Sequence, residues 1–489
     1  MRPFFRWLDE RVDLAGAKAA LLDREVPDRL TWWHTLGSAT LTVFLVQVVT
    51  GVVLAAFYSP SPDHAYDSIR YIDHQVGSGA LLRGIHHWGA SAMVVLVVAH
   101  VIRVFTVGAY KYPREPNWLI GVGLFLLVMG FGFTGYLLPW DQKAYWATAV
   151  GTNIAGTTPL VGGWLVAVLR GGAELGAATL SRFYAFHVLW LPLLLGALVL
   201  VHLALVIRQG IAPRPAALEV GAPARTTDPG YPNYYRDAYA ATKRGGVRFW
   251  PDIIGKDTVV SVAVVIVIVL LAATAGAPLE PPADPTDSAY VPRPEWYFLP
   301  LYQLLKLVPG SLESWVAFGV PTAFLIVLVA LPFFDRRSTR NLLRRPAAIA
   351  ALTVLLGGSA FLIGAAARSA GPHIPPEVGR PLTSPERAGR ALFQSQQCSG
   401  CHKVAGQGGD QGPDLSDVGL RHSAAWLHSF IEAPTTFHPD SRMPAFGPPA
   451  LSHEEIEELA RYLATLRGKA APDVVPQFHD TFPGPPARP

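Results

Sequence analysis

The chain has 489 residues, of which 51% are hydrophobic and 16% are charged. Soluble domains carry about 25% charged residues, so this composition is typical of a membrane protein. The formal net charge is +4 and the cations lie between apolar runs, which argues against a nucleic-acid partner. Only two cysteines are present, Cys398 and Cys401, which excludes a disulfide scaffold and an iron–sulfur cluster held by four cysteines.

Seven apolar windows approach the roughly 20 residues that span a bilayer. They lie at 36–57, 89–108, 118–138, 184–207, 258–277, 315–334 and 347–367. The second is expected to begin near Leu81, because His86 and Trp88 can lie inside a bundle. The first twenty residues mix acids with bases and lack a continuous apolar stretch. We therefore expect an amphipathic segment on the membrane surface there, and not a cleavable signal peptide.

The loop charges predict the orientation. Lysine and arginine are frequent before the first window and after the second, fourth and sixth, whereas the alternate loops are poorer in these residues. By the positive-inside rule the N-terminus is cytoplasmic, and seven crossings place the C-terminus outside. We therefore expect a multi-pass protein of a bacterial cytoplasmic membrane, with the residues after 367 on the outer, periplasmic side.

The sequence becomes polar after the last window. A capping box at Ser452 and Glu455 predicts the start of the last helix. The predicted fold class is all-α, with a seven-helix membrane bundle followed by a small helical domain. The expected segments are a four-helix domain (1–215), a three-helix domain (216–367), a Pro/Gly linker (368–385), a small helical domain (386–468) and a disordered tail (469–489).

Two windows each carry two histidines, His86 with His100 and His187 with His202. Spacings of fourteen and fifteen residues leave offsets of about −40° and +60° on an α-helix, so each pair lies roughly on one face. The members of a pair are about 21–22 Å apart along the axis. Side by side, the two helices would offer two bis-histidine sites, as two haems stacked across a bilayer require. The alternative is four interior histidines that bond to neighbours, which the matched spacing disfavours.

Glycine spacing supports haem binding. Glycines lie fourteen residues apart in the first window (Gly37 and Gly51) and in the third (Gly121 and Gly135). A porphyrin that approaches a helix closely needs a missing side chain, and two porphyrins need two such gaps. The alternative is that these small residues only let membrane helices pack. Arg83 and Arg103, near the ends of the second window, are candidates for pairing with haem propionates.

The run Cys398-Ser399-Gly400-Cys401-His402 has the spacing of a c-type haem attachment motif. Two thioethers would hold the haem, and His402 would be the axial ligand. A thioredoxin-like pair is the alternative, but no βαβ pattern surrounds the motif. Met443 is the only methionine beyond the membrane part and is the expected sixth ligand. The remaining distal histidines are interpreted as surface residues: His422, His428, His438 and His453.

These motifs resemble a known family, cytochrome b of the Rieske/cytochrome bc complexes. The resemblance covers Arg83–Arg114, Gly135–Asp141, Arg182–Gln209 and residues 231–367. The last range includes Pro294-Glu295-Trp296-Tyr297, a tetrapeptide specific to the quinol-oxidation site of this family. The His187–His202 spacing and the three-span second half are similar to the cytochrome b6f branch, whose two halves are usually separate chains. Residues 386–468 resemble a monohaem class I cytochrome c.

The resemblance implies roles for individual residues. His86 and His187 would hold one haem b near the outer face, and His100 and His202 the other near the cytoplasm. Glu295 would accept a proton from quinol, and Tyr297 and Tyr136 would line the same pocket. The chain departs from the family at three positions: Thr35 replaces the cysteine that holds an extra haem in the b6f branch, and Ile207 and His87 replace arginines. We therefore expect no extra haem, and Arg208 is a candidate for the cytoplasmic quinone site.

We predict the cytochrome b/c fusion subunit of a proton-translocating quinol:cytochrome c oxidoreductase. In this prediction, quinol is oxidised at the outer face of the membrane. One electron passes through a Rieske iron–sulfur protein to haem c, and the other through two b haems to quinone on the cytoplasmic side. Other expected partners are a cytochrome c or terminal oxidase, membrane lipid and a second copy of the complex. The alternatives are a membrane anchor that carries electrons linearly to a partner enzyme, and a haem-bearing sensor or electron store.

Overall fold

The computed structural model describes residues 2–27, 30–283, 285, 293–368, 378, 380, 382–468 and 476–481. It divides into two compact units, Met1–Ala283 with Pro292–Ala365, and Asp284–Val291 with Ala366–Pro489. The described residues are mostly helical, as the all-α class predicts, and their strands form two short antiparallel pairs. The predicted linker 368–385 and tail 469–489 lie largely outside the described residues.

Seven helices among the described residues are long and apolar enough to cross a membrane, which confirms the predicted number. They are α3 (Leu36–Ala55), α5 (Gly79–Thr106), α6 (Glu115–Tyr136), α9 and α10 (Ala177–Ala185 and Leu191–Gln209, joined by the π turn Phe186–Trp190), α12 (Ile254–Ala275), α14 (Gly310–Phe334) and α15 (Pro346–Arg368). The fourth span begins before its predicted start because Arg182 is accommodated by protein. Its guanidinium donates to the carbonyls of Ala167 and Val168, both at 2.7 Å.

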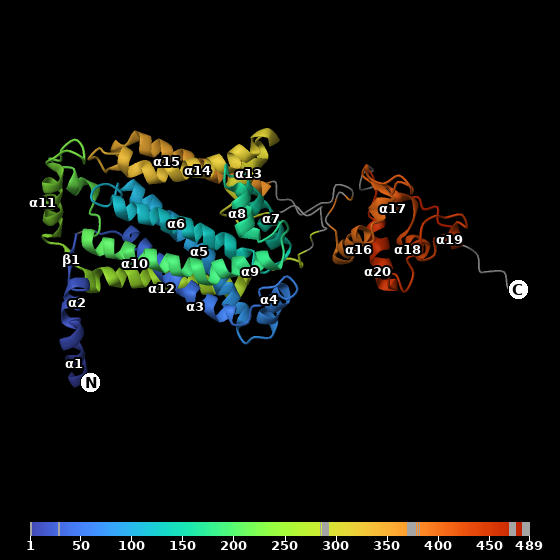
Figure 1. Ribbon diagram of the computed structural model, residues 1–489, viewed down its shortest axis with the longest axis horizontal. Coiled ribbons are helices and arrows are strands. Elements are labelled where there is room, and N and C mark those ends of the chain that lie inside the picture. Colours follow the sequence, from blue (N-terminus) through green and yellow to red (C-terminus); the bar gives the residue numbers. More distant parts are fainter. Residues whose placement is uncertain are drawn as a thin grey trace. The chain divides into compact units, whose positions relative to one another are not determined.

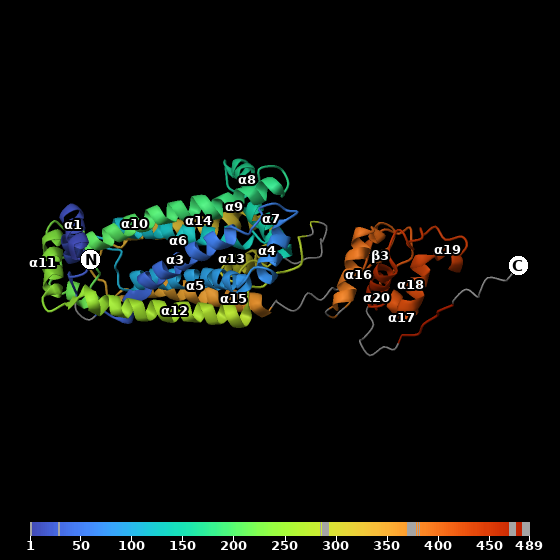
Figure 2. The same cartoon turned by 90° about the horizontal axis from the view of Figure 1, so that it is seen from below.

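The membrane helices of the first unit lie side by side, and short elements gather at the two ends of this bundle (Figures 1 and 2). One end carries α1 (Arg2–Val12), α2 (Leu14–Leu21), α11 (Tyr231–Lys243) and the pair of β1 (Glu25–Val26) with β2 (Val247–Arg248). The other carries α4 (Ala65–His74), α7 (Gln142–Gly156), α8 (Gly162–Arg170) and α13 (Leu299–Leu307). Helices α3 and α12 pack on α5, and α10 and α14 pack on α6.

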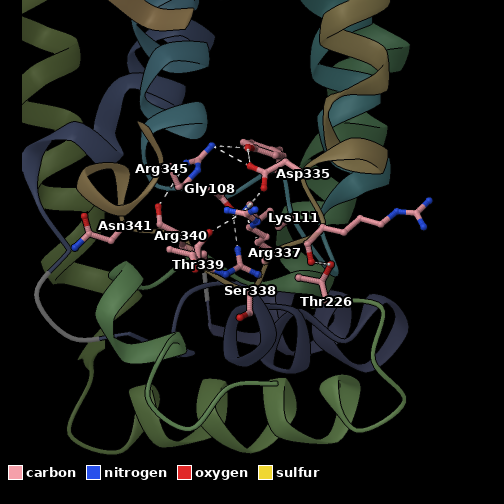
Figure 3. Close-up of polar contacts among 12 residues, drawn as sticks. Gly108, Lys111, Thr226, Asp335, Arg337, Ser338, Thr339, Arg340, Asn341 and Arg345 are labelled. Carbon is pink, nitrogen blue, oxygen red and sulfur yellow. Dashed lines mark hydrogen bonds and ion pairs between the residues drawn. The ribbon is translucent and has the colours of Figure 1, made fainter. Parts of the chain in front are cut away.

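A buried polar network joins the loop between α5 and α6 to the loop between α14 and α15 (Figure 3). Lys111 Nζ donates to Asp335 Oδ1 at 2.9 Å and to two backbone carbonyls of the second loop at 2.7 and 2.8 Å. Arg340 donates to the carbonyls of Gly108 and Tyr112 at 2.6 and 2.8 Å. Lys111 and Arg340 are each 1% exposed, so cations that the sequence analysis counted only as loop charges connect the two parts of the bundle.

The second unit is built around three helices, α16 (Ser384–Ser395), α18 (Ala424–Glu432) and α20 (His453–Leu463). Its other elements are η6 (Cys398–Gly400), β3 (Lys403–Val404), β4 (Gln407–Gly408), α17 (Val418–Arg421) and α19 (Pro434–Phe437). Phe393, Trp426 and Ile456 belong to one buried core. The predicted capping box is confirmed, because Ser452 and Glu455 bond reciprocally at the start of α20.

Part of the segment predicted to be a disordered tail has ordered contacts. Asp480 accepts a hydrogen bond from the Ser423 hydroxyl at 2.6 Å, and the amide of His479 donates to the carbonyl of Arg421 at 2.8 Å. The described residues 476–481 therefore pack against α17 and α18. The segment is rich in proline and alanine, which favoured disorder, and its contacts could not be read from the sequence because each depends on a partner more than fifty residues away.

Candidate haem sites and quinol site

The four membrane histidines form two opposed pairs. The ring centroids of His86 and His187 are 6.2 Å apart, and those of His100 and His202 are 6.4 Å apart. An imidazole–metal bond is about 2 Å long and the ring centre lies about 1.1 Å behind the nitrogen, so two imidazoles on opposite sides of one metal have centres about 6.3 Å apart. Both pairs therefore fit one iron porphyrin each.

A glycine of a neighbouring helix faces each of these histidines. The nearest histidine atom to a Cβ built on each glycine is Cε1, at 3.4 Å for Gly37 and His100, 3.2 Å for Gly51 and His86, 3.8 Å for Gly121 and His202, and 2.7 Å for Gly135 and His187. The predicted glycines thus lie against the predicted histidines one to one. Helices α3 and α6 supply gaps at the two levels where α5 and the fourth span, formed by α9, the π turn and α10, carry imidazoles.

Two threonines fix the tautomer of the first histidine pair. Thr50 Oγ1 lies 2.8 Å from His86 Nδ1, and Thr134 Oγ1 lies 2.9 Å from His187 Nδ1. Each hydroxyl donates its single proton to the backbone carbonyl four residues earlier, at 2.7 and 2.9 Å respectively. Each must therefore accept from the imidazole Nδ1–H, which leaves Nε2 with the lone pair that a metal needs.

A π turn explains why the two histidines of the fourth span are fifteen residues apart, whereas those of α5 are fourteen apart. His187 lies within Phe186–Trp190, where the amide of Leu191 donates to the carbonyl of Phe186 five residues earlier. A π turn accommodates one more residue than an α turn. Fifteen residues that include this turn therefore advance the helix about as far as fourteen α-helical residues do. His187 and His202 thus have about the same offset along their helix as His86 and His100 have along α5.

The two arginines predicted to bind propionates have different surroundings. Arg83 already has protein partners: Nε donates to Asp73 Oδ1 at 2.7 Å, and Nη2 donates to the carbonyl of Ala277 at 2.6 Å. Arg103 is half-buried, and its Nε and Nη2 atoms are buried with no hydrogen-bond partner within the described ranges. Nδ1 of His100 is likewise without a described partner. Arg103 thus has free donors for an anionic group, whereas Arg83 is engaged by protein.

The residues of the predicted quinol site come together from two parts of the chain. The Tyr297 hydroxyl donates to the carbonyl of Gly132 at 3.3 Å, one turn of α6 before Gly135. Burial and the nearby Glu295 carboxylate raise the pKa of Tyr297 far above its ordinary value. The Phe298 ring connects the two tyrosines, because its centroid lies 4.8 Å from that of Tyr297 and 6.4 Å from that of Tyr136. Glu295, Tyr297 and Tyr136 therefore share one site beside the His86–His187 pair.

Sequence reasoning missed the cation in this site. Lys143, in the first turn of α7, donates from Nζ to Glu295 Oε1 at 2.5 Å. The Lys143 side chain is 23% exposed and that of Glu295 is 15% exposed. The partners are 152 residues apart in the chain, so no spacing rule could have paired them.

Candidates for the quinone site at the opposite end of the bundle are less defined. Arg208 is exposed there, and Thr35 is buried with its hydroxyl bonded to the carbonyl of Trp32.

The attachment motif of the second unit lies in a turn against the core. His402 Nδ1 lies 2.8 Å from the carbonyl oxygen of Pro413, which suits an imidazole that presents Nε2 to a metal. A Cβ on Gly412 would lie 2.5 Å from the His402 ring, so a gap is again required beside the imidazole. Cys398 and Met443 both pack on the core of this unit.

The competing histidines of this unit have other surroundings. Of the four histidines interpreted as surface residues, two are exposed (His438 and His453) and two are half-buried (His422 and His428). The His422 ring stacks on Trp426 at 3.7 Å. His428 Nε2 lies 3.3 Å from the carbonyl oxygen of His453.

A membrane bundle with two bis-histidine sites, joined to a unit with a Cys-X-X-Cys-His motif, defines a membrane-bound multihaem cytochrome. Residues 21–210 match the family "Cytochrome b/b6/petB", residues 282–378 match "Cytochrome b(C-terminal)/b6/petD" and residues 386–467 match "Cytochrome c". The chain belongs to the cytochrome b family and carries a C-terminal cytochrome c domain.

Two curated relatives have the name menaquinol:cytochrome c reductase cytochrome b subunit. That of Geobacillus thermodenitrificans is 42% identical and that of Bacillus subtilis (strain 168) is 41% identical, each over 220 residues. These matches cover 98% of each relative and 43% of this chain. A solved structure entitled "Hyperthermophilic respiratory Complex III" is 29% identical with a TM-score of 0.62, and the match covers 73% of this chain and 90% of that one.

Proposed function

We propose that this chain is the cytochrome b/c subunit of a menaquinol:cytochrome c reductase, a respiratory complex III. The names of the relatives support menaquinol as the substrate, a choice that the residues alone left open. The observation that carries the proposal is the position of the Glu295 segment. Tyr297, two residues on, bonds the carbonyl of Gly132 one turn from the glycine that faces His187, and the Phe298 ring contacts both Tyr297 and Tyr136. A carboxylate in such a place can take a proton from quinol close to the first electron acceptor.

The haem ligands in this proposal are the two histidine pairs of the bundle and the His402–Met443 pair of the second unit. Cys398 and Cys401 would hold the c haem covalently. Arg103 would donate to a propionate of the haem held by His100 and His202, because it has buried donors without described partners. When bound, these haems supply one-electron redox chemistry on two branches, with the b haems on one and the c haem on the other.

The protein residues of the quinol pocket have distinct roles in this proposal. Tyr136 and Tyr297 provide aromatic walls that exclude water, and Glu295 accepts the proton of the quinol hydroxyl. One electron leaves quinol for a Rieske iron–sulfur partner and then for the second unit, and the other crosses the bundle to quinone at the His100 end. Two arguments support an outward-facing His86 end, with protons released outside and taken up inside: the loop charges, and the attachment of c-type haem outside the cytoplasmic membrane.

The second unit would act as a tethered electron acceptor. A linked domain is present at a high effective concentration, so the transfer that follows the iron–sulfur partner does not depend on diffusion of a free cytochrome. The next acceptor would be a separate cytochrome c or terminal oxidase. We propose that the complex is a homodimer by its family resemblance.

The test uses the purified complex with its partner subunits, a menaquinol analogue and an inhibitor of the quinone-reduction site. An oxidant pulse is added while the b-haem and c-haem absorbances are recorded. We expect the b haems to become more reduced as the c haem is oxidised, because the two quinol electrons are separated. Simultaneous oxidation of both haem types would contradict the proposal and would favour a linear conduit from quinol to a partner enzyme.

A further inference from the structure

The ion pair between Lys143 and Glu295 has no role in the function proposed above. Lys143 belongs to the first turn of α7, and Glu295 precedes a turn closed by a hydrogen bond from the amide of Phe298 to the carbonyl of Glu295 at 2.9 Å. The pair therefore connects the 1–215 part of the bundle to the 216–367 part within the quinol site. Both side chains are largely shielded from water.

The backbone around Lys143 is fixed independently of the ion pair. Asp141 caps α7 through the amide of Ala144 at 2.8 Å, and its other carboxylate oxygen accepts from the amide of Glu280 at 3.0 Å. The amide of Gln142 donates to the carbonyl of Pro281 at 2.9 Å. The start of α7 is thus attached to the segment that leads toward Glu295, so the backbone position of Lys143 does not depend on the ion pair.

The other titratable groups near the carboxylate come from α5, α6 and its own segment. The charges of Glu295 and Lys143 both act on His87 of α5, and the charge of Glu295 acts on Tyr136 of α6 and on Tyr297. None of these groups carries a fixed positive charge. Arg83 of α5 also acts on His87, but its guanidinium is bonded to Asp73 at 2.7 Å, whereas Lys143 contacts the Glu295 carboxylate directly.

We propose that Lys143 is a positioning residue for quinol oxidation, a counter-ion that holds the Glu295 carboxylate ready for the proton and then stabilises the quinol anion. The inference rests on the function proposed for Glu295. The quinol O–H bond breaks and a Glu295 O–H bond forms, so the negative charge moves from the carboxylate to the quinol oxygen. The ammonium of Lys143 is present throughout. The quinol anion then gives one electron to the oxidised iron–sulfur partner.

An ammonium group beside both the Glu295 carboxylate oxygen and the quinol oxygen lowers the free-energy cost of moving the negative charge from the first to the second. Without the ammonium, the carboxylate would be a buried charge without a partner and the quinol anion would form in an apolar site, and both states are costly. Neutral quinol binds before any charge moves, so its affinity depends mainly on the aromatic walls. Loss of Lys143 should therefore lower kcat and leave KM nearly unchanged.

The experiment measures steady-state menaquinol-analogue oxidation by the purified complex with the variants K143M, K143R, E295Q and K306Q. We expect K143M to lower kcat about tenfold with KM within about twofold, and K143R to recover most of the rate because it keeps the charge. The matched control is K306Q, which removes an exposed lysine of α13 that lies over the Tyr302 ring, and we expect it to retain the wild-type rate. The b-haem spectrum of each variant checks that the bundle is intact.

The outcomes separate this inference from the proposed function. E295Q with wild-type activity would contradict the proposed role of Glu295 and with it this inference. A strong loss in E295Q with a normal kcat in K143M would overturn only the role of Lys143. A rate in K143R as low as in K143M, with intact b-haem spectra in both, would also overturn it, because the effect would then depend on side-chain shape and not on charge.

Discussion

Threonine precedes glycine in two of the four positions that face a histidine, and this difference separates the two ends of the bundle. Thr50 and Thr134 each bond Nδ1 of the histidine that the next residue faces. At the other end the residue before the glycine is Leu36 or Ile120, which cannot form such a bond. The first pair of imidazoles is therefore oriented by side chains of the bundle, whereas the ring of His100 has no such support among the described residues.

The closest approach between a glycine and a histidine gives a sharp prediction. A Cβ on Gly135 would lie 2.7 Å from Cε1 of His187, so G135V must displace the imidazole from its partner His86. We expect G135V to lose about half of the non-covalent haem, as measured by the pyridine haemochrome assay, because only one of the two bis-histidine sites depends on His187. Gly196 has no atom within 4 Å of a built Cβ, so G196A is the matched control and should keep the full haem content.

Residues with a helical period were accessible to sequence reasoning, and residues defined by tertiary contact were not. The histidines and glycines recur at fixed intervals on single helices, so their faces can be calculated. The Thr-Gly pairs at 50–51 and 134–135 were a visible signal for the tautomer, although it was not used. In contrast, the partners of Arg83 and Glu295 lie on other elements, and no local pattern identifies Asp73 or Lys143.

At the scale of single elements, the π turn at Phe186–Trp190 predicts an unusual tolerance to deletion. Removing Leu189 would let the turn become α-helical and would leave His187 and His202 at their present relative positions. We expect this deletion to retain both b haems in the absorbance spectrum. Deletion of Val94 from α5, which has no π turn between His86 and His100, would rotate one histidine by about 100° relative to the other. That variant should lose a haem, and equal haem loss in both variants would contradict the argument.

The start of α16 predicts a dependence on acid pH. Hydrogen bonds from Arg380 lower the pKa of Glu386 to about 2, aided by the amide of Thr383. The pKa of glutamate in an unfolded chain is about 4.3, so the carboxylate stabilises the second unit above that pH and loses its effect as pH falls from about 4.3 toward 2. The capping box joins Glu386 to the first turn of α16.

This effect can be measured as the difference in Tm between the wild-type chain and E386Q, followed at the Soret band of the c haem. The difference should be largest near pH 6 and should shrink as the pH falls from about 4 to about 2. E454Q changes an exposed glutamate in the first turn of α20 and serves as the control. If the Tm difference for E386Q did not change with pH, the ionised form of Glu386 would not be responsible.

For the whole molecule, apolar runs of bilayer length were sufficient to predict the number of crossings and the class of the fold. Such runs are long, continuous and bounded by charges, so a single sequence defines them well. The same reasoning could not place α7, α8 and α13 at one end of the bundle, because their packing depends on contacts between distant segments. It also treated Lys111 and Arg340 only as loop charges, whereas both are buried partners of backbone carbonyls.

That network explains how the two parts of the bundle remain together, and it predicts the behaviour of a divided chain. Gly245 lies in a loop between α11 and β2 with a φ of +80°, and a break after it would leave Lys111 and Asp335 on separate chains. We expect the co-expressed parts 1–245 and 246–489 to purify together with both b haems. Removing one partner of a buried ion pair costs about 3–5 kcal/mol. K111Q or D335N should therefore reduce the yield of the divided complex strongly, and should lower the Tm of the intact chain. R344Q is the matched control, because the Arg344 side chain is 72% exposed and its ion pair with Glu219 is long, at 3.7 Å. Equal yields for K111Q and R344Q would show that apolar packing alone holds the two parts together.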